Sequence, residues 1–201
     1  MVSSGVGSSP LPASCRFRPF FLIMTSARLS WIALLLAAGA LVACHLHWMP
    51  LLPERVATHF DSAGRANGWM SRARHAWSSP FVHLGMAAFI VGLTSFWHRL
   101  PPGLLNLPYK DHWRQPEHYP VACAFLREWS RWLATVLLVG GILMDRLILQ
   151  ANQAMPPRLD SAAIGMLTAC ILAAIATAVF WLLLRFLRKP PDTSPPTAGP
   201  G

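Results

Sequence analysis

The 201-residue chain carries little charge for its length. Asp, Glu, Lys and Arg make up 12% of the residues, and only 8 residues are acidic. Soluble domains carry about twice that charged fraction. They need it to cover their surface, whereas lipid covers most of a membrane protein. Together with a hydrophobic content of 54%, the shortage of charge excludes an ordinary soluble domain and indicates a membrane protein.

Cysteine is scarce as well, with four residues that form no disulfide pattern. Cys44 and Cys170 fall within apolar runs, Cys123 within a loop expected in the cytoplasm, and Cys15 in the N-terminal segment. We expect isolated, reduced thiols.

Motifs for catalysis are missing too. The chain has no serine elbow, no phosphate-binding loop and no His-Glu-x-x-His helix, so we expect no enzyme and no cofactor. The net charge of +9 could suggest nucleic acid. The basic residues, however, flank apolar runs and form no single patch. This placement favours the lipid bilayer as partner and argues against nucleic acid.

Four apolar runs approach the roughly 20 residues that a membrane-spanning helix needs. They cover Leu29–Met49, Phe81–Trp97, Trp129–Gln150 and Ala162–Leu184. Tryptophans, which prefer the membrane interface, lie near their ends: Trp31, Trp48, Trp97, Trp129, Trp132 and Trp181. The predicted fold class is an all-α membrane protein, a four-transmembrane-helix bundle with a compact, hairpin-like outer loop.

Basic residues predict the orientation of these spans. Eleven fall on the side of the termini: Arg16, Arg18, Arg28, Arg99, Lys110, Arg114, Arg127, Arg131, Arg185, Arg188 and Lys189. Six fall on the other: Arg55, Arg65, Arg72, Arg74, Arg146 and Arg158. Since the richer side is normally cytoplasmic, we expect an inner (plasma) membrane protein with both termini in the cytoplasm.

The chain ends predict disorder around the membrane domain. Residues 1–26 have no helical period, and residues 188–201 are rich in proline. The transmembrane domain is therefore predicted at 27–187, and Met24 is an alternative start. Leu41-Val42-Ala43-Cys44 resembles a lipobox. We expect the first span to be retained as a helix, with lipidation of Cys44 as the alternative.

The loop after the first span carries turn signals. Asp61-Ser62-Ala63-Gly64 is typical of a type I turn, and Asn67-Gly68 indicates a second turn. We expect positive φ at Gly64 and a hydrogen bond to the His59 ring from Asp61 or a nearby carbonyl. Trp69 would cover this site at the membrane surface.

Two loop motifs resemble a known bacterial family. The first is Pro53, His59-Phe60, Asp61, Gly64, Gly68-Trp69 and Ser71. The second is Asn106-x-Pro108, Lys110-Asp111-His112-Trp113 and Pro116-Glu117. With the flanking spans, over roughly residues 29–150, they resemble the domain of unknown function 1648, also found in SdpI, an immunity protein against a secreted peptide toxin. The chain departs from the family pattern at His118-Tyr119-Pro120, where Pro120 should delay the third helix.

Other residues leave alternatives open. Outer His59, Asp61, His45 and His47 could converge on a metal, but their spacing matches no zinc signature, and structural or proton-sensing histidines are the alternatives. Asp145 is among the deepest charges; we expect it to pair with an outer-loop arginine, a substrate contact being the alternative. Gly165, Ala169, Ala173 and Thr177 form a small-residue stripe, for packing in the bundle or for a second copy of the chain.

These observations predict a non-enzymatic membrane protein that is protective or sensory through its outer loop. An external peptide or another membrane protein would be its partner. The alternative is a small transporter or channel subunit, which would need a water-filled path lined by Asp145 and the histidines.

Overall fold

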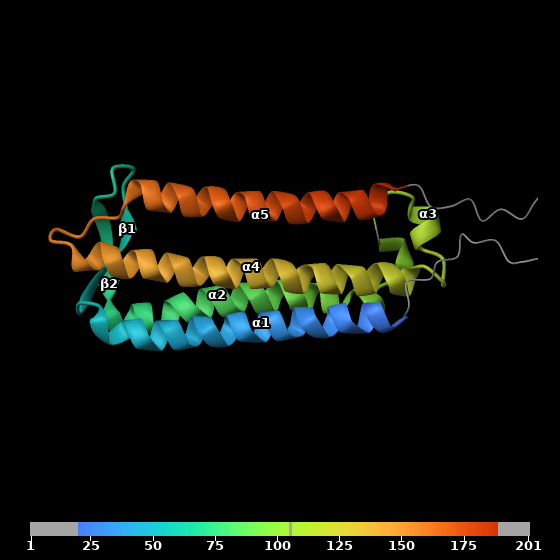
Figure 1. Ribbon diagram of the computed structural model, residues 1–201, viewed down its shortest axis with the longest axis horizontal. Helices are drawn as coiled ribbons and strands as arrows, with labels where there is room; N and C mark the ends of the chain where they lie inside the picture. The colour runs from blue at the N-terminus through green and yellow to red at the C-terminus, as the bar shows by residue number, and fades with distance from the viewer. Residues whose placement is uncertain (1–19, 105, 189–201) are drawn as a thin grey trace, which may run out of the picture.

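The computed structural model describes residues 20–104 and 106–188, with side chains from Ala27 onward. Four long helices run side by side: α1 (Phe20–Trp48), α2 (Arg72–Ser95), α4 (Tyr119–Gln153) and α5 (Ser161–Leu187) (Figure 1). All four are long and apolar enough to cross a membrane. The predicted all-α, four-helix membrane fold is confirmed, and the chain is a multi-pass membrane protein.

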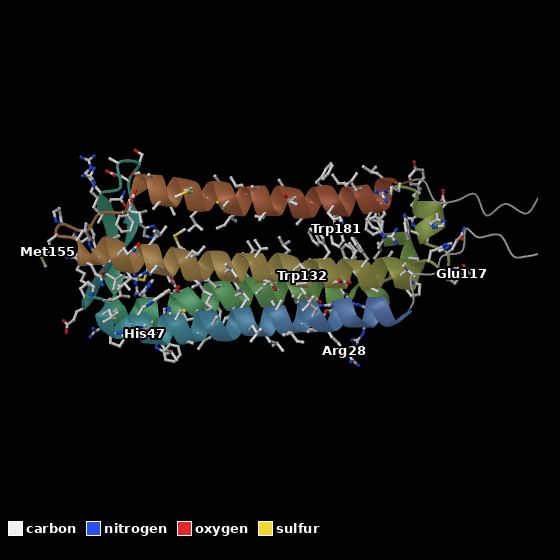
Figure 2. All side chains as sticks on the ribbon, in the orientation of Figure 1. Arg28, His47, Glu117, Trp132, Met155 and Trp181 are labelled. Carbon is white, nitrogen blue, oxygen red and sulfur yellow. The ribbon has the colours of Figure 1, made fainter. Side chains whose placement is uncertain are left out.

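The two ends of the bundle differ. At one end, β1 (Arg55–Phe60) and β2 (Ala66–Ser71) form an antiparallel hairpin after the 3-10 turn η1 (Met49–Leu51). This is the predicted hairpin-like loop. At the other end lie η2 (Trp97–Arg99), η3 (Pro102–Leu104) and the short α3 (Lys110–Trp113) (Figure 1). We call these the hairpin end and the α3 end; Met155 and Glu117 mark them in Figure 2.

Helix boundaries depart from the predictions in three places. Residues 20–26, predicted to be disordered, belong to α1. Helix α2 begins at Arg72 rather than Phe81 and contains Pro80. Pro120 lies in the first turn of α4, where its missing N–H costs nothing, and does not delay the helix. Residues 1–19 and 189–201 of the predicted disordered ends lie outside the described residues.

Helix α4 is the centre of the bundle and packs against α1, α2 and α5. Two adjacent glycines let it do so. A Cβ at Gly140 would lie 2.8 Å from the Ile171 side chain on α5, and one at Gly141 would lie 2.7 Å from the His83 ring on α2. Small residues permit such close helix approach in membranes, where apolar burial alone gives little driving force.

Helix α5 is less embedded, because α4 is its main neighbour among the helices. Leu167 and Phe186 are its buried residues. The small-residue stripe of Gly165, Ala169, Ala173 and Thr177 is exposed along its whole length. The interpretation of this stripe as packing within the bundle is therefore wrong, and a contact with a second copy stays a prediction.

Candidate functional site

Five polar side chains gather inside the bundle near the hairpin end. We call them the hairpin-end cluster: His45 on α1, His75, Ser79 and His83 on α2, and Asp145 on α4. Asp145 accepts a 2.7 Å hydrogen bond from the Ser79 hydroxyl, and its other oxygen lies 3.3 Å from Nδ1 of His45. His45, His75, Ser79 and Asp145 are all buried. Because ionisable groups in membrane spans are costly, such a cluster is a functional candidate by default.

The sequence of α2 explains how His45 is held. Pro80 has no N–H, so the carbonyl four residues earlier, that of Ala76, loses its helical donor. Nε2 of His45 lies 3.1 Å from that carbonyl oxygen. A carbonyl only accepts, so Nε2 carries a hydrogen and donates it. His45 thus supplies the donor that Pro80 lacks, and this hydrogen bond joins α1 to α2.

The same geometry fixes the protons of the cluster. With Nε2 donating to Ala76, a further proton lies between Nδ1 of His45 and Oδ2 of Asp145, whichever atom holds it. The Ser79 hydroxyl is used as a donor to Asp145, so Nδ1 of His83, 3.4 Å away, is the donor to Ser79. The histidine ring of His75 lies 5.9 Å from that of His45, centroid to centroid.

This cluster corrects one prediction. Asp145 was expected to pair with an arginine from the outer loop, but it pairs with His45 and Ser79. An arginine could not replace them, because the carboxylate lies below the hairpin, among side chains of the spans. The spacing of His75, Ser79 and His83, four residues apart, could have shown that they share one helix face.

Asn152 joins the hairpin to the helix that carries Asp145. Its side chain accepts from the backbone N–H of Ala57 at 2.8 Å and donates to the carbonyl of the same residue at 2.9 Å. Asn152 follows Asp145 by two helical turns and therefore lies on the same face of α4. Leu149, between them, packs with Val56 of β1 and Leu52. The hairpin thus rests on one face of α4, directly above the cluster.

The predicted turn is confirmed at Gly64 and differs at Gly68. Gly64 has φ +77°, donates its N–H to Asp61, and a Cβ there would collide with the carbonyl oxygen of Leu159. Gly68 does not lie in a turn: it is within β2, paired with His59. A Cβ on it would lie 2.9 Å from that of His59, so cross-strand contact explains the glycine.

The other predicted loop residues are placed as follows. Asp61 bonds Arg65 rather than His59, through Nε at 2.9 Å and the backbone N–H at 2.8 Å, and these bonds lower the pKa of Asp61. The His59 side chain is exposed and makes no hydrogen bond to any residue that the structure describes. Trp69 is 43% exposed, with the Arg55 guanidinium 5.2 Å from its ring centre. Ser71 caps α2 by accepting from the N–H of Arg74.

The second predicted motif lies at the opposite end. Its residues sit in the α3 loop and are mostly exposed: Asn106, Pro108, Lys110, Asp111, Pro116 and Glu117. The length of the bundle separates them from Asp61 and Asp145, so the two motifs form no common site (Figure 1). Near them, burial and the neighbouring His118 and Arg185 lower the pKa of His112.

The described residues contain no group of three or more His, Cys, Asp or Glu side chains placed to hold a metal ion. His45 is buried and already bonded, whereas His47, two residues on, is exposed on the other face of α1 (Figure 2). Residues two apart in a helix do not share a face, so these two histidines do not converge.

A groove of about 430 Å³ runs under the hairpin turn and along α5. Asp61, Ser62 and Gly64 form one wall. Apolar and small residues of α5 form the other: Ile164, Gly165, Thr168, Ala169 and Leu172. Gly64 fixes this junction, because its carbonyl accepts the N–H of Leu159 at 2.8 Å. The groove therefore offers a polar rim and an apolar floor at the hairpin end.

Residues 34–84 match the model of a domain of unknown function, DUF1648. The matched segment holds the second half of α1, the whole hairpin and the first half of α2, including four residues of the hairpin-end cluster. The α3 loop and Asp145 lie outside it. No curated protein and no solved structure matches the chain. Over these residues, the chain is similar to the DUF1648 family.

Proposed function

We propose that this protein is a non-enzymatic membrane receptor whose hairpin meets an external peptide or small amphipathic ligand. The response would be protective or sensory, as the resemblance to a family that includes a toxin-immunity protein suggests. The hairpin would face outward and the termini the cytoplasm of a bacterial inner membrane. The excess of basic residues at the α3 end supports this orientation.

One observation carries the proposal: the face of α4 that holds Asp145 also holds the hairpin. Asn152 forms hydrogen bonds with both the backbone N–H and the carbonyl of Ala57. Leu149, which lies on α4 between Asn152 and Asp145, packs on Val56. A ligand that displaces the hairpin must therefore move or release α4 at the level of the cluster. Since Asp145 joins α4 to α1 and α2, such a shift would reach three of the four spans.

The groove under the turn supplies a place for the ligand. Its apolar floor on α5 suits an apolar side chain or a lipid-like group, and the polar turn suits a peptide backbone. Helix α5 is the least embedded of the four helices, so the groove can widen without breaking the hairpin-end cluster, to which α5 contributes no residue.

The test is a growth challenge of a deletion strain with membrane-active peptides. We expect the wild-type gene to restore resistance or response, and His59→Ala and Trp69→Ala to weaken it while membrane yield is kept, because both residues are exposed. Trp77→Ala is the matched control, since Trp77 is 81% exposed and belongs to α2 rather than to the hairpin strands. If His59→Ala and Trp69→Ala behave like wild type under every challenge, the hairpin is only a connector and the proposal fails.

A transporter is the second candidate, favoured by three histidines and one carboxylate inside the spans. Against it, both oxygens of Asp145 are engaged by protein groups, and the groove under the hairpin turn is not lined by the hairpin-end cluster. Proteoliposomes with an internal pH dye separate the two functions. Proton or solute flux that Asp145→Asn abolishes would support the transporter; flux equal to that of empty liposomes would support the receptor.

A further inference from the structure

Arg131 on α4 lies near the α3 end of the bundle and is held in a fixed position there. Its Nε donates to the Ser30 hydroxyl on α1 at 2.8 Å, and Ser30 in turn donates to the carbonyl of Ala27. The guanidinium carbon lies 5.2 Å from the centre of the Trp31 ring. Arg131 is 6% exposed and Ser30 is fully buried. A hydrogen bond and a cation–π contact therefore orient the guanidinium against α1.

The depth of Arg131 in the membrane follows from its partners. Arg28 is the one charged residue in the sequence of α1 and marks the membrane interface on that helix, and Ser30 and Trp31 follow it within one turn. Helix α4 has 35 residues and spans about 52 Å, well beyond a hydrocarbon core of about 30 Å. Its first turns therefore project out of the core, and Arg131 lies level with Trp31 at the interface, where lipid phosphates are found.

The donors of Arg131 are only partly used. A guanidinium has five N–H groups in a planar fork, and the bond to Ser30 takes one. In the part of the chain that the structure describes, the two terminal nitrogens of Arg131 have no hydrogen bond to protein and no ion pair. They are the groups of this side chain that can bind an external anion.

The charge around Arg131 suits an anion. Arg127 is one turn earlier on α4, and Glu128 is the acidic neighbour; both act on Arg131 electrostatically. Two arginines against one glutamate leave a positive site beside an interfacial tryptophan.

We propose that Arg131 and Trp31, with Arg127, bind the phosphate of an anionic phospholipid in the leaflet at the α3 end. The guanidinium fork matches two phosphate oxygens, and the ring of Trp31 lies at the depth of the glycerol backbone. The lipid would seal the seam between α1 and α4, beside the contact between Thr94 and Ser130 that joins α2 to α4 at 2.7 Å.

The test is native mass spectrometry of the full chain in detergent with equal amounts of phosphatidylglycerol and phosphatidylcholine. We expect the wild type to retain phosphatidylglycerol preferentially. Arg131→Gln should lower that preference about fivefold, the effect of one basic residue near the membrane surface. Arg74→Gln removes the same charge from an exposed residue at the hairpin end and should leave the preference unchanged.

Two further arms keep the outcome decisive. Trp31→Leu and Ser30→Ala leave the charge of Arg131 in place but remove a contact that orients its guanidinium, so both should weaken retention of phosphatidylglycerol. These two variants test the proposal even if Arg131→Gln fails to fold. Inorganic phosphate should not displace the lipid. Equal retention in Arg131→Gln and Arg74→Gln, or displacement by inorganic phosphate, would overturn the proposal.

Discussion

The two ends of the bundle differ in how the buried polar side chains of the spans are satisfied. At the hairpin end, Asp145, His45 and Ser79 satisfy one another, and the histidine also satisfies the carbonyl that Pro80 leaves open. At the α3 end, Arg131 is fixed by Ser30, but its terminal nitrogens have no bond to the described protein groups. The first arrangement is closed and joins helices to each other. The second leaves donors for a partner outside the chain.

We propose separate tasks for the two ends. The closed cluster would transmit a displacement of the hairpin, because breaking the cluster leaves an unpaired group in a medium of low dielectric constant. The open cationic site would hold the bundle in one leaflet through a bound lipid.

The orientation of the ends gives the largest effect, which is all or none. A reporter fused after Gly68 should be active only outside the cytoplasm, and one fused after Asn106 only inside it. The reason is the count of eleven basic residues on one side against six on the other. The reverse activities would exchange the tasks assigned to the two ends.

Asp145→Leu should lower the free energy of unfolding by about 3–5 kcal/mol, the usual cost of removing one member of a buried charged pair. Nδ1 of His45 would be left without a hydrogen-bond partner. The double variant His45→Leu with Asp145→Leu should recover part of the loss, since the buried imidazole is gone and only the Ala76 carbonyl and the Ser79 hydroxyl lack their partners. Unfolding in mixed detergent measures all three proteins, and additive losses would show that the two side chains are independent.

Gly64→Ala should cost about 1–2 kcal/mol for the positive φ alone, with more from the collision with the Leu159 carbonyl. The yield of folded protein in membranes should fall. Gly39→Ala is the control, because nothing lies within 4 Å of a Cβ there and alanine favours a helix. Equal yields of the two variants would show that the hairpin turn does not rest on the α4–α5 loop.

Acid should weaken the hairpin turn by a small amount. Hydrogen bonds from the backbone and side chain of Arg65 lower the pKa of Asp61 below the usual 3.8. A carboxyl with a lowered pKa stabilises the fold above its unfolded pKa, and this contribution is lost as the pH falls through the folded pKa. The melting temperature of wild type should therefore approach that of Asp61→Asn below pH 3.8. A constant gap between them down to pH 2 would assign the effect to another group.

The sequence predicted the parts of the fold that depend on local composition. Apolar runs located four spans, and the Asp61–Gly64 turn located the hairpin, because hydropathy and turn chemistry act within a few residues. The start of α2 was missed, since Arg72, Arg74 and Pro80 are typical of a loop. A serine cap and the distant donor of His45 offset those preferences.

The candidate site was harder to predict because its members come from three helices. Asp145 was singled out, but its partners lie 100 and 66 residues away along the chain. His75, Ser79 and His83 are spaced four residues apart, which indicates one face of a helix. This spacing was overlooked because the residues before Phe81 were interpreted as a loop. Gly68 shows the same limit: a tight cross-strand contact with His59, rather than a turn, requires the glycine.

Hydrogen exchange of the hairpin in lipid nanodiscs tests the coupling between hairpin and cluster most directly. Two variants each remove a buried polar side chain of α4: Asp145→Leu at the hairpin end and Ser130→Ala at the α3 end. We expect faster exchange of the Ala57 amide, which Asn152 binds, in Asp145→Leu and unchanged exchange in Ser130→Ala. Equal exchange of this amide in both variants and wild type would contradict the coupling and leave the cluster a purely structural feature.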